Sequence, residues 1–189
     1  MTPEEIRKFI EGGEWASITT ELRPSANKAP TGEPQPFFCS RVFRYSAPDR
    51  FECTVMNYAD ANGKVPLVKI DIAGHNVWDG PHPIADGAYN LNYVADEAYK
   101  VTPLHGGFAA VANRFPAPGL NAWEAGETQD VKGKAFPLFG LFEGQIYVDY
   151  DLIYITSGML FNGSKHVDGR AFDKPENRPT NLQIPLVRK

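Results

Sequence analysis

The C-terminal part of the chain constrains the fold most strongly. Residues 145–161 are rich in β-branched and aromatic side chains, with one interruption at Ser157-Gly158. Such a run predicts two sheet strands with a bend between them. After a polar loop, residues 182–187 predict a last short strand, in which Pro185 fits only at an edge, a bulge or a strand end. Because this strand needs a partner, we expect it to pair with an early strand and close a barrel, which removes exposed sheet edges.

The rest of the sequence predicts further strands and little helix. Thr2 is a good N-cap for a short helix within residues 1–12, which Gly12-Gly13 ends, and we expect this helix to cover one end of the barrel. A second short helix is expected after Thr102-Pro103. The predicted strands are residues 15–23, 37–45, 51–58, 65–72, 87–99, 122–124, 129–131 and 136–142, and residues 24–36 and 75–86 are predicted loops.

These elements amount to about eight or nine strands without a βαβ alternation, which predicts an all-β fold, an antiparallel barrel or a sandwich. The length of 189 residues fits a single domain that spans residues 1–189.

Composition limits the partners and the compartment. A net charge of -4 argues against binding to nucleic acid, which needs clustered Lys and Arg. Residues 1–10 are polar and acidic, which predicts neither a signal peptide nor a membrane span, so we expect a cytoplasmic protein. Cys39 and Cys53 are expected to be buried, reduced thiols. The sequence leaves open whether they pair, and it leaves open the oligomeric state, with a homodimer among the alternatives.

Several motifs carry a resemblance to a known family. They are Leu160-Phe161-Asn162-Gly163, Asp168-Gly169, Pro175-Glu176 with Arg178, Pro185-Leu186-Val187, Gly13-Glu14-Trp15, Arg23, Arg41, Val101-Thr102-Pro103 and Trp123. Together they resemble a domain of the adenomatosis-polyposis-coli down-regulated Wnt inhibitor family. The resemblance implies an antiparallel, lipocalin-like (calycin-like) barrel with an apolar pocket for a lipid-like ligand. Animal members have two such domains and many cysteines, whereas this sequence has one domain and two cysteines.

One function class that the residues leave open is a binding module. In this hypothesis the barrel holds a hydrophobic or amphipathic small molecule, with a tyrosine hydroxyl or an arginine to orient it. Arg23 or Arg41 would anchor a polar end, and the lining would include Tyr89, Tyr93, Trp123 and Tyr154. The alternative for both arginines is a structural pairing with Glu21, Asp149 or Asp151.

The other function class is a cofactor-independent isomerase, cyclase or lyase. Asp149 and Asp151 lie on one face of a predicted strand, and either could move a proton if that face points inward. Tyr150 or His105 would be the acid–base partner, and arginine would stabilise developing negative charge. The alternative is that both carboxylates lie on the solvated outer face.

No cofactor or metal is predicted. The four histidines, His75, His82, His105 and His166, lack the close spacing of a metal motif. The glycine pairs at residues 12–13 and 106–107 lack the pattern of a nucleotide-binding loop.

Overall fold

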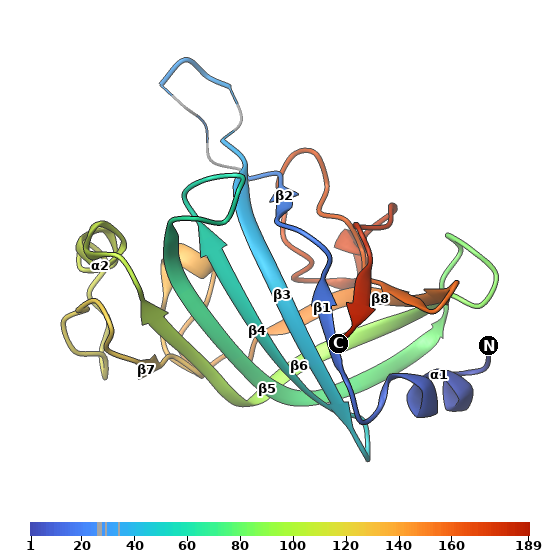
Figure 1. Ribbon diagram of the computed structural model, residues 1–189. Coiled ribbons are helices and arrows are strands. Elements are labelled where there is room, and N and C mark those ends of the chain that lie inside the picture. The colour runs from blue at the N-terminus through green and yellow to red at the C-terminus, as the bar shows by residue number, and fades with distance from the viewer. Residues whose placement is uncertain (26–27, 29, 34) are drawn as a thin grey trace.

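The protein is a closed antiparallel β-barrel, as the computed structural model shows for residues 1–25, 28, 30–33 and 35–189 (Figure 1). The strands are β1 (Glu14–Ser17), β2 (Glu21–Arg23), β3 (Phe37–Ser46), β4 (Arg50–Tyr58), β5 (Pro66–Pro81), β6 (Tyr89–Pro103), β7 (Gln129–Asp130), β8 (Val148–Thr156), β9 (Met159–Phe161) and β10 (Leu186–Arg188). The helices are α1 (Pro3–Ile10) and α2 (Gly106–Ala112), with 3₁₀ turns η1 (Pro137–Phe139) and η2 (Pro175–Asn177). The predicted all-β barrel is confirmed.

Closure takes place where the two ends of the chain meet. The strand order around the barrel is β1-β10-β9-β8-β6-β5-β4-β3, and β1 also pairs with β3, which completes the ring. Ser17 lies opposite Leu186, and Trp15 lies opposite both Arg188 and Phe43. The expected pairing of the last strand with an early one is therefore confirmed. Two short strands lie outside the ring: β2 pairs with β3, and β7 pairs with β6.

Two predicted connections differ from the structure. Residues 15–23 form two strands, because the chain leaves β10 after Ser17 and pairs with β3 again from Glu21. Residues 75–81 continue β5, so the predicted loop at 75–86 is wrong over that part. The strand continues because Gly74 allows a bulge between Ala73 and His75. Four residues of the predicted loop 24–36, at positions 26, 27, 29 and 34, lie outside the described residues.

One core lies at the end of the barrel that α1 covers, as predicted. Thr2 and Glu5 form a capping box that starts α1. Ile6 and Ile10 are buried in this core, and the Trp15 indole donates to the carbonyl of Ile10 over 2.9 Å. The other buried members include Phe43, Tyr45, Phe51, Leu91, Tyr93, Ile153, Leu160 and Leu186.

A second core lies at the end of the barrel away from α1. Residues 104–147, which we call the covering segment, pack against the inward faces of β5 and β6 there (Figure 1). The rings of Trp123 and Phe136 pack against each other within this segment in a tilted arrangement, with 5.0 Å between their centroids. The predicted strands at 122–124 and 136–142 are absent, because these apolar side chains fold over the sheet as loop and 3₁₀ turn instead of extending it.

Gly74 provides a test of the bulge that shapes β5. A Cβ atom at this position would lie 1.9 Å from the carbonyl oxygen of Val94 on the neighbouring strand. We expect Gly74→Ala to lower the free energy of unfolding by about 1–3 kcal/mol, because the backbone has to shift. Gly106→Ala is the matched control, since nothing lies within 4 Å of its Cβ position. Urea unfolding with equal losses for both variants would contradict the close packing at Gly74.

Candidate functional site

The barrel interior contains a layer of polar and charged side chains beside its apolar cores. Asp149 lies opposite Tyr93 and Asp151 lies opposite Leu91, and side chains opposite each other in a sheet share a face. Tyr93 and Leu91 are buried in the core, so both aspartates point inward. The structure therefore places the predicted carboxylate pair inside the barrel, and Asp151 is only 3% exposed.

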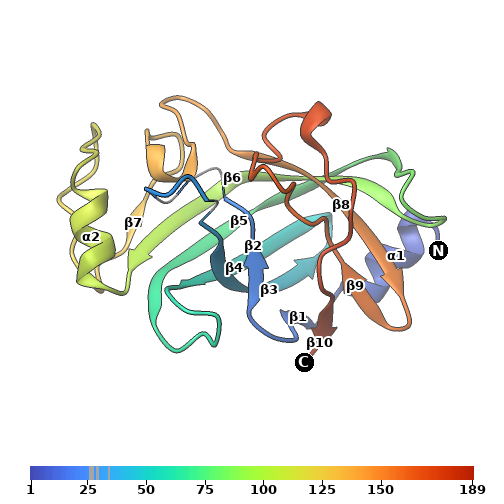
Figure 2. The ribbon, with the colours of Figure 1, turned by 90° about the horizontal axis from the view of Figure 1, so that it is seen from above.

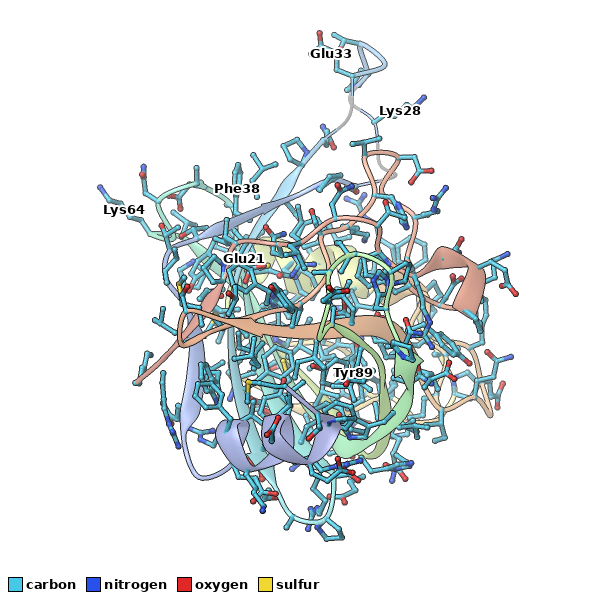
Figure 3. The ribbon with its side chains drawn as sticks, turned by 90° about the vertical axis from the view of Figure 1, so that its right-hand side faces the viewer. Glu21, Lys28, Glu33, Phe38, Lys64 and Tyr89 are labelled. Atoms are coloured by element: carbon cyan, nitrogen blue, oxygen red, sulfur yellow. The ribbon has the colours of Figure 1, made fainter. Side chains whose placement is uncertain are left out.

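Glu21 is the centre of the charged layer and is 0% exposed. It lies in the upper half of the barrel in Figure 3, whereas Tyr89 lies lower, toward α1. Arg41 Nε donates to one carboxylate oxygen of Glu21 over 2.9 Å, and Arg23 Nη2 donates to the other over 2.7 Å. Arg23 Nε also donates to the second oxygen over 3.0 Å, and the Ser17 hydroxyl donates to the first over 2.6 Å. These charged and polar donors replace the hydrogen bonds to water that the Glu21 carboxylate loses on burial.

The electrostatics of Glu21 follow from these contacts. Burial alone would raise the pKa of the Glu21 carboxyl, but the guanidiniums of Arg41 and Arg23 and the Ser17 hydroxyl outweigh it and lower the pKa to about 2. The same pairing raises the pKa of Arg41 despite its burial. The cluster is therefore fully ionised near neutral pH.

Arg41 connects this cluster to the opposite wall of the barrel. Its Nη1 donates to Asn162 Oδ1 over 3.2 Å, and Asn162 Nδ2 donates to the Tyr93 hydroxyl over 3.0 Å. The hydroxyls of Tyr93 and Tyr45 are 2.9 Å apart. Arg41 is 7% exposed, and its Nη2 has no hydrogen-bond partner among the residues that the structure describes. Its guanidinium also lies 5.5 Å from the centre of the Phe43 ring.

Asp151 holds the segment that joins β9 to β10. We call these residues, 162–185, the closing segment; they lie at the same end of the barrel as β2 (Figure 2). Asp151 Oδ1 accepts from the Gly163 amide over 2.7 Å, and the Asp151 carbonyl accepts from Arg178 Nη1 over 2.9 Å. Gly163 is required here, because a Cβ atom would lie 1.9 Å from Pro179 and 2.6 Å from Asp151 Oδ1.

Both aspartates have a raised pKa. Burial and the neighbouring charge of Asp149 raise the pKa of Asp151 to about 7, against the amides of Leu152 and Gly163 and the charge of Arg41. Burial also raises the pKa of Asp149, which accepts a hydrogen bond of 3.2 Å from the Tyr147 hydroxyl. Asp151 is therefore the carboxyl of this layer that changes its protonation around neutral pH.

Lys165 completes the charged layer near the surface. Its ammonium lies 5.3 Å from the centre of the Phe37 ring, and it is half-buried. Burial and the charge of Arg23 lower the pKa of Lys165. The layer thus combines three carboxyl groups, from Glu21, Asp149 and Asp151, with three cations, from Arg23, Arg41 and Lys165.

The other predicted site residues lie elsewhere. Tyr150 and Tyr154 point away from the interior, because they alternate with Asp149 and Asp151 along β8. Arg178 covers the Tyr150 ring at 5.4 Å. Tyr89 lies near α1 and donates to the Met1 carbonyl over 3.3 Å, and Trp123 is buried in the core of the covering segment.

His105 has a local structural contact. It is the exposed N-cap of α2, and its Nδ1 accepts from the Gly107 amide over 3.0 Å. Of the ten predicted site residues, the structure gathers Arg23, Arg41, Tyr93, Asp149 and Asp151 in one layer.

Four members of the layer are not among the site residues predicted from the sequence: Glu21, Asn162, Lys165 and Tyr147. For Glu21 a signal was present, because residues 15–23 alternate and place Trp15, Ser17 and Glu21 on one face. Asn162 and Gly163 stand in the motif that carries the family resemblance, but their contacts depend on the path of the closing segment.

Two small cavities are present, each of about 10 Å³, which is room for about one water molecule. One is lined by Tyr45, Asn76 and Trp78 beside α1, and the other by Tyr99, Leu141 and Tyr147 beside the covering segment. Neither of these two cavities has room for a ligand larger than a water molecule.

No family model matches the chain. What the structure shares with the family resemblance is the closed antiparallel barrel. Among residues 1–25, 28, 30–33 and 35–189, no three His, Cys, Asp or Glu side chains are arranged to hold a metal ion. In the same described part of the chain, no helix is long and apolar enough to cross a membrane. Cys39 and Cys53 are both buried and unpaired.

The Glu21 cluster predicts a loss of stability in acid. Because the pKa of Glu21 is about 2 in the fold and 4.5 without it, its contribution is complete above pH 4.5 and is lost as the pH falls toward 2. The contribution is roughly 3 kcal/mol. We expect Glu21→Gln to be less stable than the wild type near neutral pH, and the gap to shrink across this window in urea unfolding. The exposed Glu52→Gln is the control; a Glu21→Gln gap that does not change with pH would contradict the assignment.

Proposed function

We propose that the barrel binds a small amphipathic molecule whose polar end contacts Arg41. The observation that carries this proposal is Arg41 Nη2, a buried, charged donor without a partner among the described residues. An unsatisfied buried donor costs about 1–3 kcal/mol, and more when it is charged. An oxygen atom of a ligand restores that hydrogen bond, whereas the Nε and Nη1 donors of Arg41 are already used by Glu21 and Asn162.

The surroundings of Arg41 suit a molecule with one polar end and one apolar end. Phe43 and Tyr93 pack beside it, with their rings 5.5 Å apart. Lys165 belongs to the closing segment, and its ammonium lies over the Phe37 ring and interacts electrostatically with Arg23. The apolar part of the ligand would lie against Phe37 and the aromatic side chains, and the polar end would reach Arg41.

Binding in this position requires the closing segment to open. Arg41 is only 7% exposed and donates to Asn162, the first residue of the closing segment, so the ligand has to displace part of residues 162–185 to enter. This segment is held by contacts with the barrel wall, those of Asn162 with Arg41, Gly163 with Asp151 and Arg178 with the Asp151 carbonyl among them. Because residues 162–185 form no strand, we expect opening them to cost less than opening the barrel sheet, where each strand is paired on both sides.

Native mass spectrometry of freshly purified protein tests the proposal. We expect a stoichiometric small-molecule adduct that is released on denaturation and can be identified. The double variant Glu21→Gln/Arg41→Gln removes one charge of each sign and should lose the adduct. Glu14→Gln/Arg44→Gln is the matched control, because it removes an exposed ion pair on the outer face of β1 and β3. A clean apo mass for the wild type, before and after incubation with a cell extract, would contradict binding.

A second candidate function is a cofactor-independent isomerase, cyclase or lyase. The inward position and raised pKa of Asp149 and Asp151 favour it, since a general base near neutral pH needs both. Incubating the released molecule with the protein in heavy water distinguishes the two functions. Deuterium incorporation that Asp149→Asn or Asp151→Asn abolishes would support an enzyme, and recovery of the unchanged molecule would support a binding protein.

A further inference from the structure

Above about pH 7, where Asp151 is ionised, the charged layer is electrically balanced before any ligand enters. When all groups are ionised, the three carboxylates of Glu21, Asp149 and Asp151 equal the three cations of Arg23, Arg41 and Lys165. A buried net charge is costly unless it is paired. A ligand that brings a negative charge to Arg41 therefore gives this layer an excess negative charge, and one carboxylate has to become neutral.

Arg41 and Asp151 are connected by hydrogen bonds to the first two residues of the closing segment, Asn162 and Gly163. The Asn162 side chain accepts from Arg41 Nη1, and the next amide, Gly163, donates to Asp151 Oδ1 over 2.7 Å. An anion bound at Arg41 Nη2 thus lies in the same layer as the Asp151 carboxyl. The direct electrostatic interaction of Arg41 with Asp151 agrees with this placement.

Asp151 is the carboxyl that neutralises most readily. Glu21 accepts hydrogen bonds from two guanidiniums and has a pKa of about 2. Burial raises the pKa of Asp149 as well, but Tyr147, Arg23, Arg41 and Lys165 all favour its anion, whereas the charge of Asp149 itself raises the pKa of Asp151 further. Both amides that bind the Asp151 carboxyl use Oδ1, which leaves Oδ2 to carry a proton. The titratable and charged groups that face Asp151 are Asp149 of β8, Arg41 and Tyr45 of β3, Tyr93 of β6, Tyr147 of the covering segment and Arg178 of the closing segment.

We infer that the ligand carries a carboxylate, which binds Arg41 Nη2, and that Asp151 takes up one proton from solvent when this ligand binds. The inference rests on the proposed ligand binding. No covalent bond of the ligand changes: buffer loses a proton and Asp151 Oδ2 gains it. The negative charge of the ligand and the positive charge of the proton cancel, so the net charge of the layer stays the same. Protonated Asp151 can then donate a hydrogen bond toward the bound anion.

Isothermal titration calorimetry with octanoate and octan-1-ol tests this inference. The two probes share the alkyl chain and differ in charge, so we expect octanoate to bind at least about tenfold more tightly. Titrations in phosphate and in Tris, whose ionisation enthalpies differ, give the number of protons taken up. Because the pKa of Asp151 is about 7 without ligand, uptake should be small at about pH 6 and close to one proton at about pH 8. The affinity for octanoate should fall about tenfold over the same range.

Two variants complete the test. Asp151→Asn should bind octanoate without proton uptake and with the same affinity at about pH 6 and about pH 8. Asp168→Asn, an exposed carboxylate in the same segment, should behave like the wild type. If Asp151→Asn does not fold, the proton count of the wild type at the two pH values is decisive alone.

Each outcome has a separate meaning. Equal affinity for the acid and the alcohol, or binding without proton uptake at about pH 8, would overturn the inference and leave the proposed binding function standing. If neither probe binds and no adduct is found, the binding function fails, and the inference fails with it.

Discussion

The buried pairing of Glu21 with Arg41 and Arg23 is the interaction on which the arrangement of the barrel interior depends. A buried ion pair adds little stability compared with an apolar pair of the same size, because desolvation offsets the attraction. Removing one partner, however, leaves a buried charge uncompensated, which costs about 3–5 kcal/mol. The cluster therefore favours the native fold by destabilising other strand registers. β2 must pair with β3 in the register that places Glu21 opposite Cys39. A shift of one residue would turn Glu21 outward and leave Arg41 alone in the interior.

The same arginine extends this constraint to the far wall of the barrel. Through Asn162, Arg41 is connected to Tyr93 on β6, and Asn162 Nδ2 also donates to the carbonyl of Leu152 on β8 over 3.2 Å. The next residue, Gly163, binds Asp151 and leaves no room for a side chain. Closing the barrel and fixing the closing segment are thus parts of one network. A ligand that draws on Arg41 has to act through this network, which couples binding to the position of residues 162–185.

The sequence patterns predicted the barrel, its closure by the last strand, the helix α1 and the hairpin between β3 and β4. Each of these features depends on local patterns and turn residues. It did not reveal that β5 continues past Gly74, because a bulge and a loop share the same glycine signal. For the site, the pattern placed Asp149 and Asp151 on one face but could not say which face is inward. Alternation along β8 also separates Tyr150 and Tyr154 from the two aspartates, so these tyrosines could not share an interior site with them. His105 and Trp123 belong to the covering segment, whose path no periodicity predicts.

A purely structural role explains most contacts of the charged layer but not all of them. Both carboxylate oxygens of Glu21 accept hydrogen bonds, and Arg41 Nε and Nη1 each donate one. This is expected for a network in which buried polar groups find hydrogen-bond partners. The Arg41 Nη2 donor, unpartnered among the described residues, and the Asp151 carboxyl, whose pKa is about 7, do not fit that account. Apolar side chains at these positions would avoid the cost of burying both groups. Both residues bond to the start of the closing segment, Arg41 to Asn162 and Asp151 to Gly163. An unpaired donor beside an acid that can change its charge is what a site for an exchangeable anion requires, since the donor binds the anion and the acid restores neutrality.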